Sequence, residues 1–160
     1  MEGKKVKESS ATIAHVMQPQ DANPAGNIHG GVIMKYIDTA AGVVAVRHAR
    51  CNVVTASIDR LDFYTPVFVG NLLTLKAGIN MVGNTSMEVG VRVTAEDLLS
   101  GAVCHIASAY LTFVALDETL KPTRIPLLIL ASDNERRRNL EAVERKKMRL
   151  AEKKKENHAI

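Results

Sequence analysis

Hydrophobic and polar residues alternate in two different ways along this chain, and the first third contains both. A short apolar stretch over residues 11–17 has the pattern of a strand and ends near Pro19. Residues 19–31 are dense in Gly, Pro, Asn and Asp, which favour turns, so we expect a loop there. From Val32 to about His48 apolar residues recur at spacings of three and four, which predicts one long helix before the tail.

The next eighty residues have the composition of strands. Four stretches are rich in Val, Ile, Thr and Leu and are separated by turn-forming residues: 52–58, 72–81, 86–94 and 102–114. Their connections are too short for crossover helices, so we expect all four to follow one another in an antiparallel meander. With the early strand and the helix, the pattern predicts an α+β protein in which a five-stranded antiparallel sheet wraps around one central helix. Because such a sheet has open edges, pairing into a dimer would complete it.

Length and charge divide the chain into a core and a tail. The 160 residues can bury one core but are short for two. Residues 131–160 hold ten Lys and Arg against six Asp and Glu, so the whole net charge of +4 lies in this tail. The tail lacks Gly and Pro, which predicts an exposed basic helix, either merely solvated or attractive to polyanions such as nucleotide phosphates. We therefore expect a flexible N-terminus over 1–10, one domain over 11–130 and a basic helical extension over 131–160.

Composition argues against several classes of protein. The sequence has no apolar run long enough to span a membrane, and no signal peptide follows its charged start, so we expect a cytoplasmic protein without a membrane partner. Cys51 and Cys104 lie in apolar stretches without CxxC spacing, which predicts reduced, buried side chains and no metal site. Trp is absent and aromatic residues make up only 4%, which disfavours a nucleic-acid partner. Motifs for P-loop, zinc-protease and serine-nucleophile chemistry are absent from the sequence.

Asp38 is the first candidate for chemistry. It falls within the second turn of the predicted helix, among residues that are almost all apolar. Partial desolvation there would make the carboxylate a stronger base, able to activate a water or to attack an electrophile. The alternative is an Asp that faces solvent or is stabilised by the helix dipole.

The loop before the helix supplies further candidates. Gly30 and Gly31 lead into the helix start, where unpaired backbone N–H groups could polarise a carbonyl or hold an oxyanion. Asn23 could orient a water or a carbonyl through its side-chain amide, and His29 could act as a base. For each of these residues an ordinary role in a glycine-rich turn is the alternative.

Several separated motifs agree, in order, with those of one family. Residues 21–38, Asp-Ala-Asn-Pro-Ala-Gly-Asn-Ile-His-Gly-Gly-Val-Ile-Met-Lys-Tyr-Ile-Asp, closely resemble the opening of the hot-dog acyl-CoA thioesterases. That group includes brain acyl-CoA hydrolase and its single-domain bacterial relatives. The likeness continues through 53–59, 84–89 and 109–114, and it spans about residues 11–125. The basic tail is also similar to the C-terminal helix of that family.

The resemblance implies a hot-dog fold and hydrolysis of acyl-CoA to a free fatty acid and CoA, with no cofactor. It assigns catalysis to Asn23 and Asp38, which would meet across a dimer interface, each from a different subunit. Asp38 would act as general base or nucleophile, and Asn23 would position the water or the carbonyl. The amides of Gly30 and Gly31, beside His29, would then stabilise the oxyanion.

The resemblance also bears on the substrate and the assembly. CoA should lie near Asn84, Thr85 and Ser86, with Arg60 or Arg92 as candidate phosphate contacts. The alternative is that Thr85 and Ser86 form an ordinary turn and that the two arginines are surface charges. Because family members usually form a trimer of dimers, we expect a homohexamer whose minimal active unit is the dimer.

Two other functions stay open. One is a hot-dog dehydratase or hydratase acting on acyl chains, whose sites combine a His with a carboxylate. His29 is present, but that arrangement is not. The other is a regulator that binds acyl-CoA without catalysis and contacts nucleic acid through its basic tail. No helix-turn-helix signal precedes the core, and Asp38 with Asn23 would be superfluous in such a protein.

Overall fold

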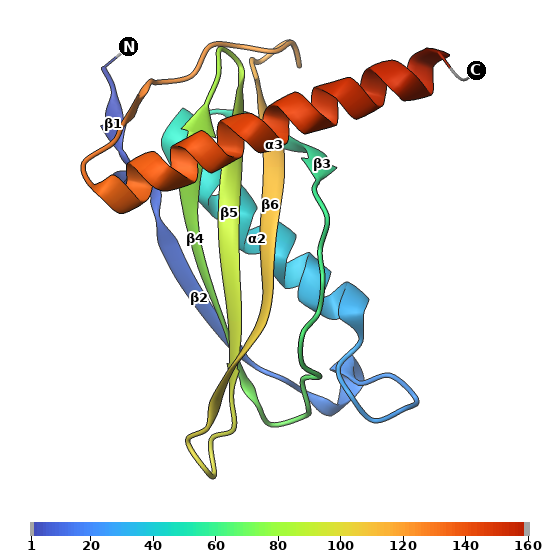
Figure 1. Cartoon of the computed structure of the whole chain (residues 1–160). Coiled ribbons are helices and arrows are strands. Elements are labelled where there is room, and N and C mark those ends of the chain that lie inside the picture. Colours follow the sequence, from blue (N-terminus) through green and yellow to red (C-terminus); the bar gives the residue numbers. More distant parts are fainter. Residues whose placement is uncertain (1, 159–160) are drawn as a thin grey trace.

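Two long helices and a five-stranded sheet make up most of the chain, of which the computed structural model describes residues 2–158 (Figure 1). The first elements are β1 (Lys4–Lys5), α1 (Val6–Ser9), β2 (Ala11–Val16), a 3₁₀ turn (Pro19–Asp21) and α2 (Gly30–Ala49). They are followed by β3 (Asn52–Ile58), β4 (Leu72–Val82), β5 (Ser86–Glu96), β6 (Val103–Leu116), β7 (Leu128–Ile129) and α3 (Asp133–His158).

The large sheet is antiparallel throughout and has the strand order β2-β4-β5-β6-β3. Strands β4, β5 and β6 form the predicted meander. β3 does not, because it lies at the far edge and pairs with β6, so the prediction that it leads directly into a four-stranded meander is wrong. The connection over residues 59–71 is long enough to carry the chain from that edge to β4, whose other side is taken by β2.

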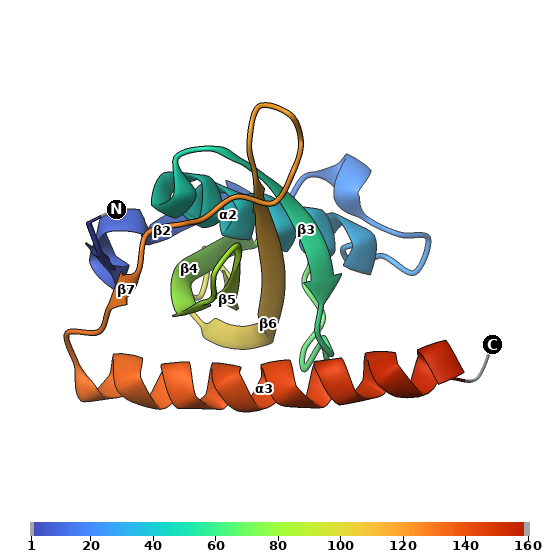
Figure 2. The same ribbon diagram turned by 90° about the horizontal axis from the view of Figure 1, so that it is seen from above.

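The sheet curls around α2, which fills its concave side (Figure 2). Burial alternates along β4, where Leu73 and Leu75 point inward while Lys76 faces outward. From α2, a stripe at helical spacing that includes Ile33, Ile37 and Val44 meets these side chains. Each fully buried Leu or Ile contributes about 1.5–3 kcal/mol to folding. The α+β architecture predicted from the sequence, a five-stranded antiparallel sheet around one central helix, is confirmed.

The N-terminal segment contacts the far end of α2. β1 pairs in parallel with β7, so part of the stretch that we expect to be flexible lies in regular secondary structure. Nζ of Lys4 donates to the backbone oxygen of His48 at 2.7 Å, which satisfies a carbonyl that the helix end leaves unpaired. Arg50 follows in the left-handed conformation, with φ of 58°, and ends the helix.

His48 is fully buried at the same end of α2. Its Nε2 lies 2.9 Å from the backbone oxygen of Pro126, so this nitrogen donates, while Nδ1 has no partner in the described part of the chain. Burial lowers the pKa of His48, although the bond to Pro126 acts in the opposite direction. The imidazole is therefore neutral in the folded protein and joins the helix to the segment that precedes α3.

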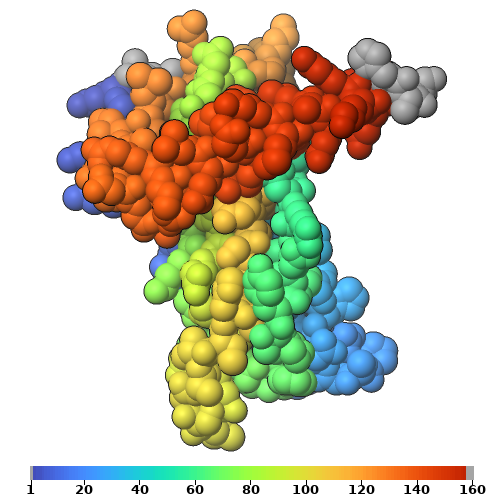
Figure 3. Space-filling view, in the orientation of Figure 1, coloured from blue at the N-terminus to red at the C-terminus, as the bar shows by residue number. Residues whose placement is uncertain are grey.

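α3 packs across the outer face of the sheet, on the side opposite α2 (Figures 2 and 3). The helix predicted for the tail is confirmed, but its expected exposure is wrong for the part that crosses the sheet. Ala142 is fully buried, Nδ2 of Asn139 donates to the backbone oxygen of Asn80 at 2.8 Å, and Arg149 pairs with Asp59 at 3.1 Å. The contacts of Asn139 and Arg149 are polar, and their partners lie far away in the sequence, so the pattern of the tail alone did not indicate them.

Glu88, on β5, anchors this helix. Its side chain is fully buried, and it accepts hydrogen bonds from Nη2 and Nε of Arg145 at 2.7 and 3.1 Å and from Nδ2 of Asn80 at 3.0 Å. The guanidinium of Arg145 also lies 3.7 Å above the centre of the Tyr110 ring. Burial alone would lower the pKa of Arg145, but the hydrogen bonds and charge of Glu88 outweigh it and raise the pKa. The pairing with Glu88 therefore favours the charged form of Arg145.

The two cysteines are free, as expected, but they are not buried. Cys51 is partly exposed and Cys104 is exposed, so the prediction of buried thiols is wrong. Cys104 lies at the start of β6, where the β5–β6 hairpin projects beyond the body of the molecule (Figure 3). The residues just before it, Ala102 and Val103, are exposed as well. Among residues 2–158, no helix combines the length and the apolar character needed to cross a membrane.

Candidate active site

Asp38 extends from α2 toward β3, where a threonine holds it. Oγ1 of Thr55 donates to Oδ1 of Asp38 at 2.7 Å. A bulge between Thr55 and Ser57 interrupts the pairing of β3 with β6, and bulges of this kind re-aim side chains. Oδ2 of Asp38 has no hydrogen-bond partner among the described residues. One oxygen of the carboxylate is thus fixed and the other is open to a reactant.

Asp38 is only half-buried within a single chain, so its site is less enclosed than the sequence suggested. Large apolar side chains beside it are exposed on the same two elements. They are Met34, Val43 and Val46 on α2, and Val54 and Ile58 on β3. Exposed apolar side chains often mark interaction sites, so the two elements that carry Asp38 and Thr55 offer surface for a further protein contact.

Asn23 shapes the loop that leads into α2. Its Oδ1 accepts from the backbone N–H of Ala25 at 3.0 Å, and its backbone oxygen accepts from Gly26 at 3.0 Å. Gly26 has φ of 90°, a conformation that glycine adopts without strain. Asn23 therefore stabilises a turn, as considered from the sequence, and of its side-chain amide only the oxygen takes part in this. Nδ2 donates to none of the described residues and is the end that could meet a substrate.

Asn23 and Gly30 line one hollow of about 240 Å³ between the loop and the start of α2. Gly31 does not line it, and its N–H donates to Nδ1 of His29 at 2.9 Å, a bond that caps the helix. The N–H of Gly30 donates to no described residue, so of the two glycine amides it is the one that is open. His29 accepts through Nδ1, so its ring caps the helix. No bond between this ring and a carboxylate is found within residues 2–158.

The structure does not bring all the candidates together in one chain. Asn23 and Gly30 lie at the start of α2, whereas Asp38 lies eight residues further on, about 12 Å along the helix axis. No hydrogen bond joins Asn23 to Asp38 within residues 2–158. Thr55, which sequence reasoning overlooked, is the only described residue that donates to Asp38. A lone Thr in a strand carries no signal of this role, because the contact depends on how β3 lies against α2.

The residues considered for CoA binding are spread over the molecule. Asn84 and Thr85 lie in the β4–β5 turn, and Ser86 begins β5. Their backbone oxygens accept hydrogen bonds from Ile125, Ala115 and Gly83 respectively. Arg60 is 86% exposed and pairs with Asp62 at 2.8 Å. Arg92 lies six residues along β5 from Ser86, about 20 Å away, and lines a groove on the outer face. The described residues contain no group of three or more His, Cys, Asp or Glu placed to hold a metal ion.

Comparison with known proteins gives one consistent family. Residues 25–102 match the model of the thioesterase superfamily. A Bacillus subtilis protein named as an acyl-CoA thioester hydrolase is 38% identical over 81% of this chain and 75% of its own length. The rat cytosolic acyl coenzyme A thioester hydrolase is 35% identical over 83% of this chain. The chain spans only about a third, 35%, of the rat protein's length.

Solved structures agree. A hexameric acyl-CoA thioesterase in its apo form is 37% identical and superposes with a TM-score of 0.91, covering 95% of this chain and 97% of its own. An acyl-CoA hydrolase from Staphylococcus aureus, solved with butyryl coenzyme A, coenzyme A and coenzyme A disulfide, is 36% identical with a TM-score of 0.87. That match covers 97% of this chain and 96% of the S. aureus chain.

Proposed function

This chain belongs to the thioesterase superfamily and has its hot-dog fold, and we propose that it hydrolyses acyl-CoA thioesters to a free fatty acid and CoA. The observation that carries the proposal is the carboxylate of Asp38, fixed through one oxygen by Thr55 and open at the other. The names of its relatives and the CoA complexes of the S. aureus hydrolase support the substrate class. CoA is substrate and product, and the mechanism needs no cofactor.

Three variants of the S. aureus hydrolase support the choice of residues. In these structures one asparagine, one aspartate and one threonine are each replaced by alanine. The three positions are separated by 15 and 17 residues, as are Asn23, Asp38 and Thr55 here. We therefore add Thr55 to the proposed catalytic set, as the residue that orients Asp38.

The chemistry follows from the open oxygen. Oδ2 of Asp38 takes a proton from a water molecule while the oxygen of that water attacks the thioester carbonyl carbon. The carbonyl oxygen becomes an oxyanion, which Nδ2 of Asn23 and the N–H of Gly30 stabilise. The carbon–sulfur bond then breaks, and the proton held by Asp38 passes to the CoA thiolate. Direct attack by Asp38, through an anhydride that water later opens, is the other course, and Thr55 would hold the carboxylate in both.

The separation of about 12 Å within one chain supports a site built from two chains. In our proposal Asn23 and Gly30 of one subunit face Asp38 and Thr55 of the other. The unpaired edge of β3 and the exposed apolar side chains beside Asp38 supply a surface for that dimer. Since a similar thioesterase is hexameric, we further infer a hexamer of three such dimers, in the cytoplasm as the rat relative's name indicates.

The contacts to the CoA portion remain a prediction. We place it near Asn84, Thr85 and Ser86 at the start of β5, with Arg60, which follows β3, as a candidate phosphate contact. Gly31 joins the oxyanion donors only if His29 releases its amide. A dehydratase gains no support, because the His29 ring bonds to a backbone amide and not to a carboxylate.

The test is release of CoA from a panel of acyl-CoAs, followed with a thiol reagent. Wild type should hydrolyse at least one chain length, and Asp38→Ala and Asn23→Ala should each be nearly inactive. Thr39→Ala is the matched control, because Thr39 adjoins Asp38 on α2 but its hydroxyl bonds only to the backbone oxygen of Lys35. Absence of release from every substrate, or full activity in Asp38→Ala, would refute the proposal. If no acyl-CoA is hydrolysed but acyl-CoA still binds, the result would favour a regulator that binds acyl-CoA without catalysis.

Mixing the two inactive variants tests the shared site. Heterodimers hold one site that combines an intact Asn23 with an intact Asp38, so part of the activity should return after subunits exchange. Exchange is checked independently by mass spectrometry of differently tagged chains. If exchange occurs and no activity returns, the site does not span two subunits.

A further inference from the structure

The hollow beside the candidate active site has largely apolar walls. Besides Asn23 and Gly30, its lining includes Ile28, Ile33 and Val67, which are each at most 3% exposed. The backbone N–H of Ile28 donates to the oxygen of Val67 at 2.7 Å, which ties two of these walls together. No residue among those that line the hollow in the described chain is charged. An apolar group could therefore enter it without leaving a buried charge unpaired.

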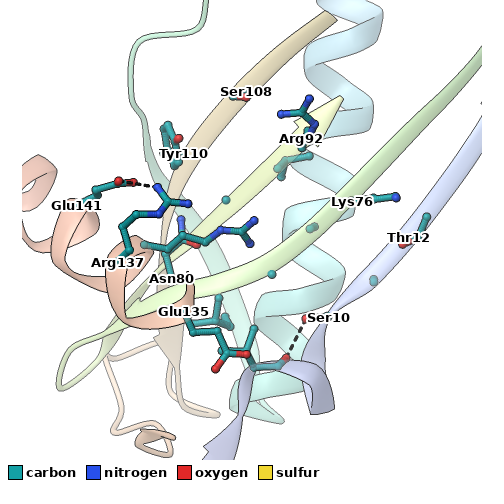
Figure 4. Close-up of a pocket in the computed structure, with 18 of the residues that line it drawn as sticks. Ser10, Thr12, Lys76, Asn80, Arg92, Ser108, Tyr110, Glu135, Arg137 and Glu141 are labelled. Atoms are coloured by element: carbon teal, nitrogen blue, oxygen red, sulfur yellow. Dashed lines mark hydrogen bonds and ion pairs between the residues drawn. The ribbon is translucent and has the colours of Figure 1, made fainter. Parts of the chain in front are cut away.

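A larger hollow elsewhere in the molecule has the opposite character. It measures about 530 Å³ and lies between the outer face of the sheet and α3 (Figure 4). Charged side chains line it, among them Lys76, Arg92 and Arg138. A hydrocarbon chain placed against these cations would displace their water and give them no partner in return. Of the two hollows, the one beside Asn23 is therefore the one suited to an acyl chain.

Phe63 differs from the other apolar residues of the smaller hollow because it is large and half-exposed, at 44%. A Cβ atom added to Gly30 would lie 3.5 Å from Cε2 of the Phe63 ring, so the ring and Gly30 are in contact range. The backbone next to Phe63 is held, because the N–H of Tyr64 donates to the oxygen of Ile106 at 2.9 Å. The ring thus borders Gly30, whose N–H donates to no described residue, from a fixed backbone.

We propose that Phe63 sets the length of the acyl chain that this protein hydrolyses best, an inference that rests on the proposed hydrolysis at Asp38. In that reaction the thioester carbonyl bonds to the N–H of Gly30, so the first carbons of the acyl chain lie against the Phe63 ring. The rest of the chain follows the buried aliphatic walls. Those walls belong to the packed core and have little room to yield, so the size of the Phe63 side chain decides how much acyl chain the hollow accepts.

The small size of the hollow favours short acyl chains. Its volume of about 240 Å³ lies below the roughly 300–1,000 Å³ that small-molecule sites commonly have. Each methylene that enters the hollow should raise kcat/KM about fourfold, the worth of burying one methylene. Once the hollow is full, further methylenes stay in water and add nothing. We therefore expect kcat/KM to rise with chain length and to level off at a short acyl chain.

Chain-length profiles of variants test this role. The value of kcat/KM is measured with saturated acyl-CoAs from acetyl to palmitoyl. Phe63→Ala enlarges the hollow, so the rise in kcat/KM should continue for about two or more carbons beyond the wild-type limit. Phe63→Trp should shorten that limit. Phe68→Ala is the matched control, because Phe68 lies on the same connection and is 51% exposed but does not line the hollow, so it should keep the wild-type profile.

The shape of the profile separates specificity from a structural role. A merely structural Phe63 would lower kcat/KM by the same factor at every chain length, and this outcome in Phe63→Ala would overturn the proposal. An unchanged profile in Phe63→Ala, or an equal shift in Phe68→Ala, would overturn it as well. Thermal unfolding checks that each variant folds. Phe63→Leu, which keeps an apolar side chain of intermediate size, should give a smaller shift in the same direction and serves if Phe63→Ala does not fold.

A failure of hydrolysis is distinguishable from a failure of this role. If wild type hydrolyses none of the acyl-CoAs, the proposed function fails, and calorimetric titration with the same series then tests the hollow through affinity. Affinity that rises with chain length and levels off at a longer chain in Phe63→Ala than in wild type would support Phe63 as the limit. Parallel affinity profiles in the two proteins, or affinity independent of chain length, would refute it.

Discussion

Glu88 and Asp38 are two carboxylates that lie on opposite faces of the same sheet. They differ in how much of their hydrogen-bonding capacity is already used by neighbouring residues. Glu88 is completely buried and accepts three hydrogen bonds from Arg145 and Asn80, so its charge is compensated. Asp38 is half-buried and accepts one hydrogen bond, from Thr55. The more deeply buried carboxylate therefore has a structural role, and the open one has the capacity to act on a substrate.

The difference shows why burial alone is a weak guide to an active site. A buried carboxylate survives in a fold only if its partners satisfy it, which then leaves nothing for a reactant. A catalytic carboxylate needs one partner to hold it in place and one oxygen free. The four predictions that follow test this contrast.

Replacing Asp38 with Asn should have the largest effect. The amide has nearly the same shape but cannot take a proton from water, so we expect kcat to fall by roughly 10²–10⁴-fold. The free energy of unfolding should change little, because Asp38 is half-exposed. Steady-state hydrolysis of the best acyl-CoA and urea unfolding measure the two quantities. A large loss of stability with a modest loss of activity would show that Asp38, like Glu88, has a structural role.

Replacing Arg145 with Met should act on stability instead. It leaves the carboxylate of Glu88 buried with Asn80 as its only donor, which should cost about 3–5 kcal/mol in the free energy of unfolding. Adding Glu88→Gln to the same chain removes the uncompensated charge and should recover part of that loss. Urea unfolding of both variants at matched protein concentration checks this. Equal stability of Arg145→Met and wild type would show that the pair does not anchor α3.

Replacing Thr55 with Val should give an intermediate result. Valine keeps the branched shape at the β3 bulge but removes the donor to Asp38, and we expect kcat to fall about 10–100-fold, the worth of one hydrogen bond to a charged group. KM should change less than kcat, since Thr55 orients the carboxylate without contacting CoA in our proposal. Activity equal to wild type would show that Asp38 needs no such support.

His48 is a buried base, and replacing it should have the smallest effect of the four, on the pH dependence of the free energy of unfolding. Because the pKa of His48 is lowered in the folded protein, the unfolded chain takes up a proton first as the pH falls through about 6.5, the ordinary pKa of a histidine. Below that pH, and down to the lowered pKa of the folded protein, His48 should reduce the free energy of unfolding by up to about 1.4 kcal/mol per pH unit. At higher pH it should have no such effect. His48→Gln should flatten the slope of the free energy of unfolding against pH. Identical slopes in wild type and His48→Gln would contradict this account.

The local sequence pattern was sufficient to predict most helices and strands, but not which strands lie next to one another in the sheet. Alternation in β4, β5 and β6 and the helical spacing of α2 gave these elements to within a few residues. The α2 start lies two residues earlier than predicted because the His29 side chain caps it. The place of β3 beside β6 was not predictable in this way, since strand order depends on how a connection crosses the sheet and leaves no periodic signal.

The sequence by itself determined the sheet-and-helix architecture, the basic tail and the candidacy of Asn23 and Asp38, the last two largely through resemblance. Only the tertiary structure decided that Thr55 holds Asp38, that Glu88 and Arg145 fix α3 to the sheet, and that Lys76, Arg92 and Arg138 share one groove. The physical reason is distance along the chain. Periodicity reports which face of an element is apolar, whereas a single hydrogen bond or ion pair joins residues 17 or 57 positions apart and leaves no pattern between them.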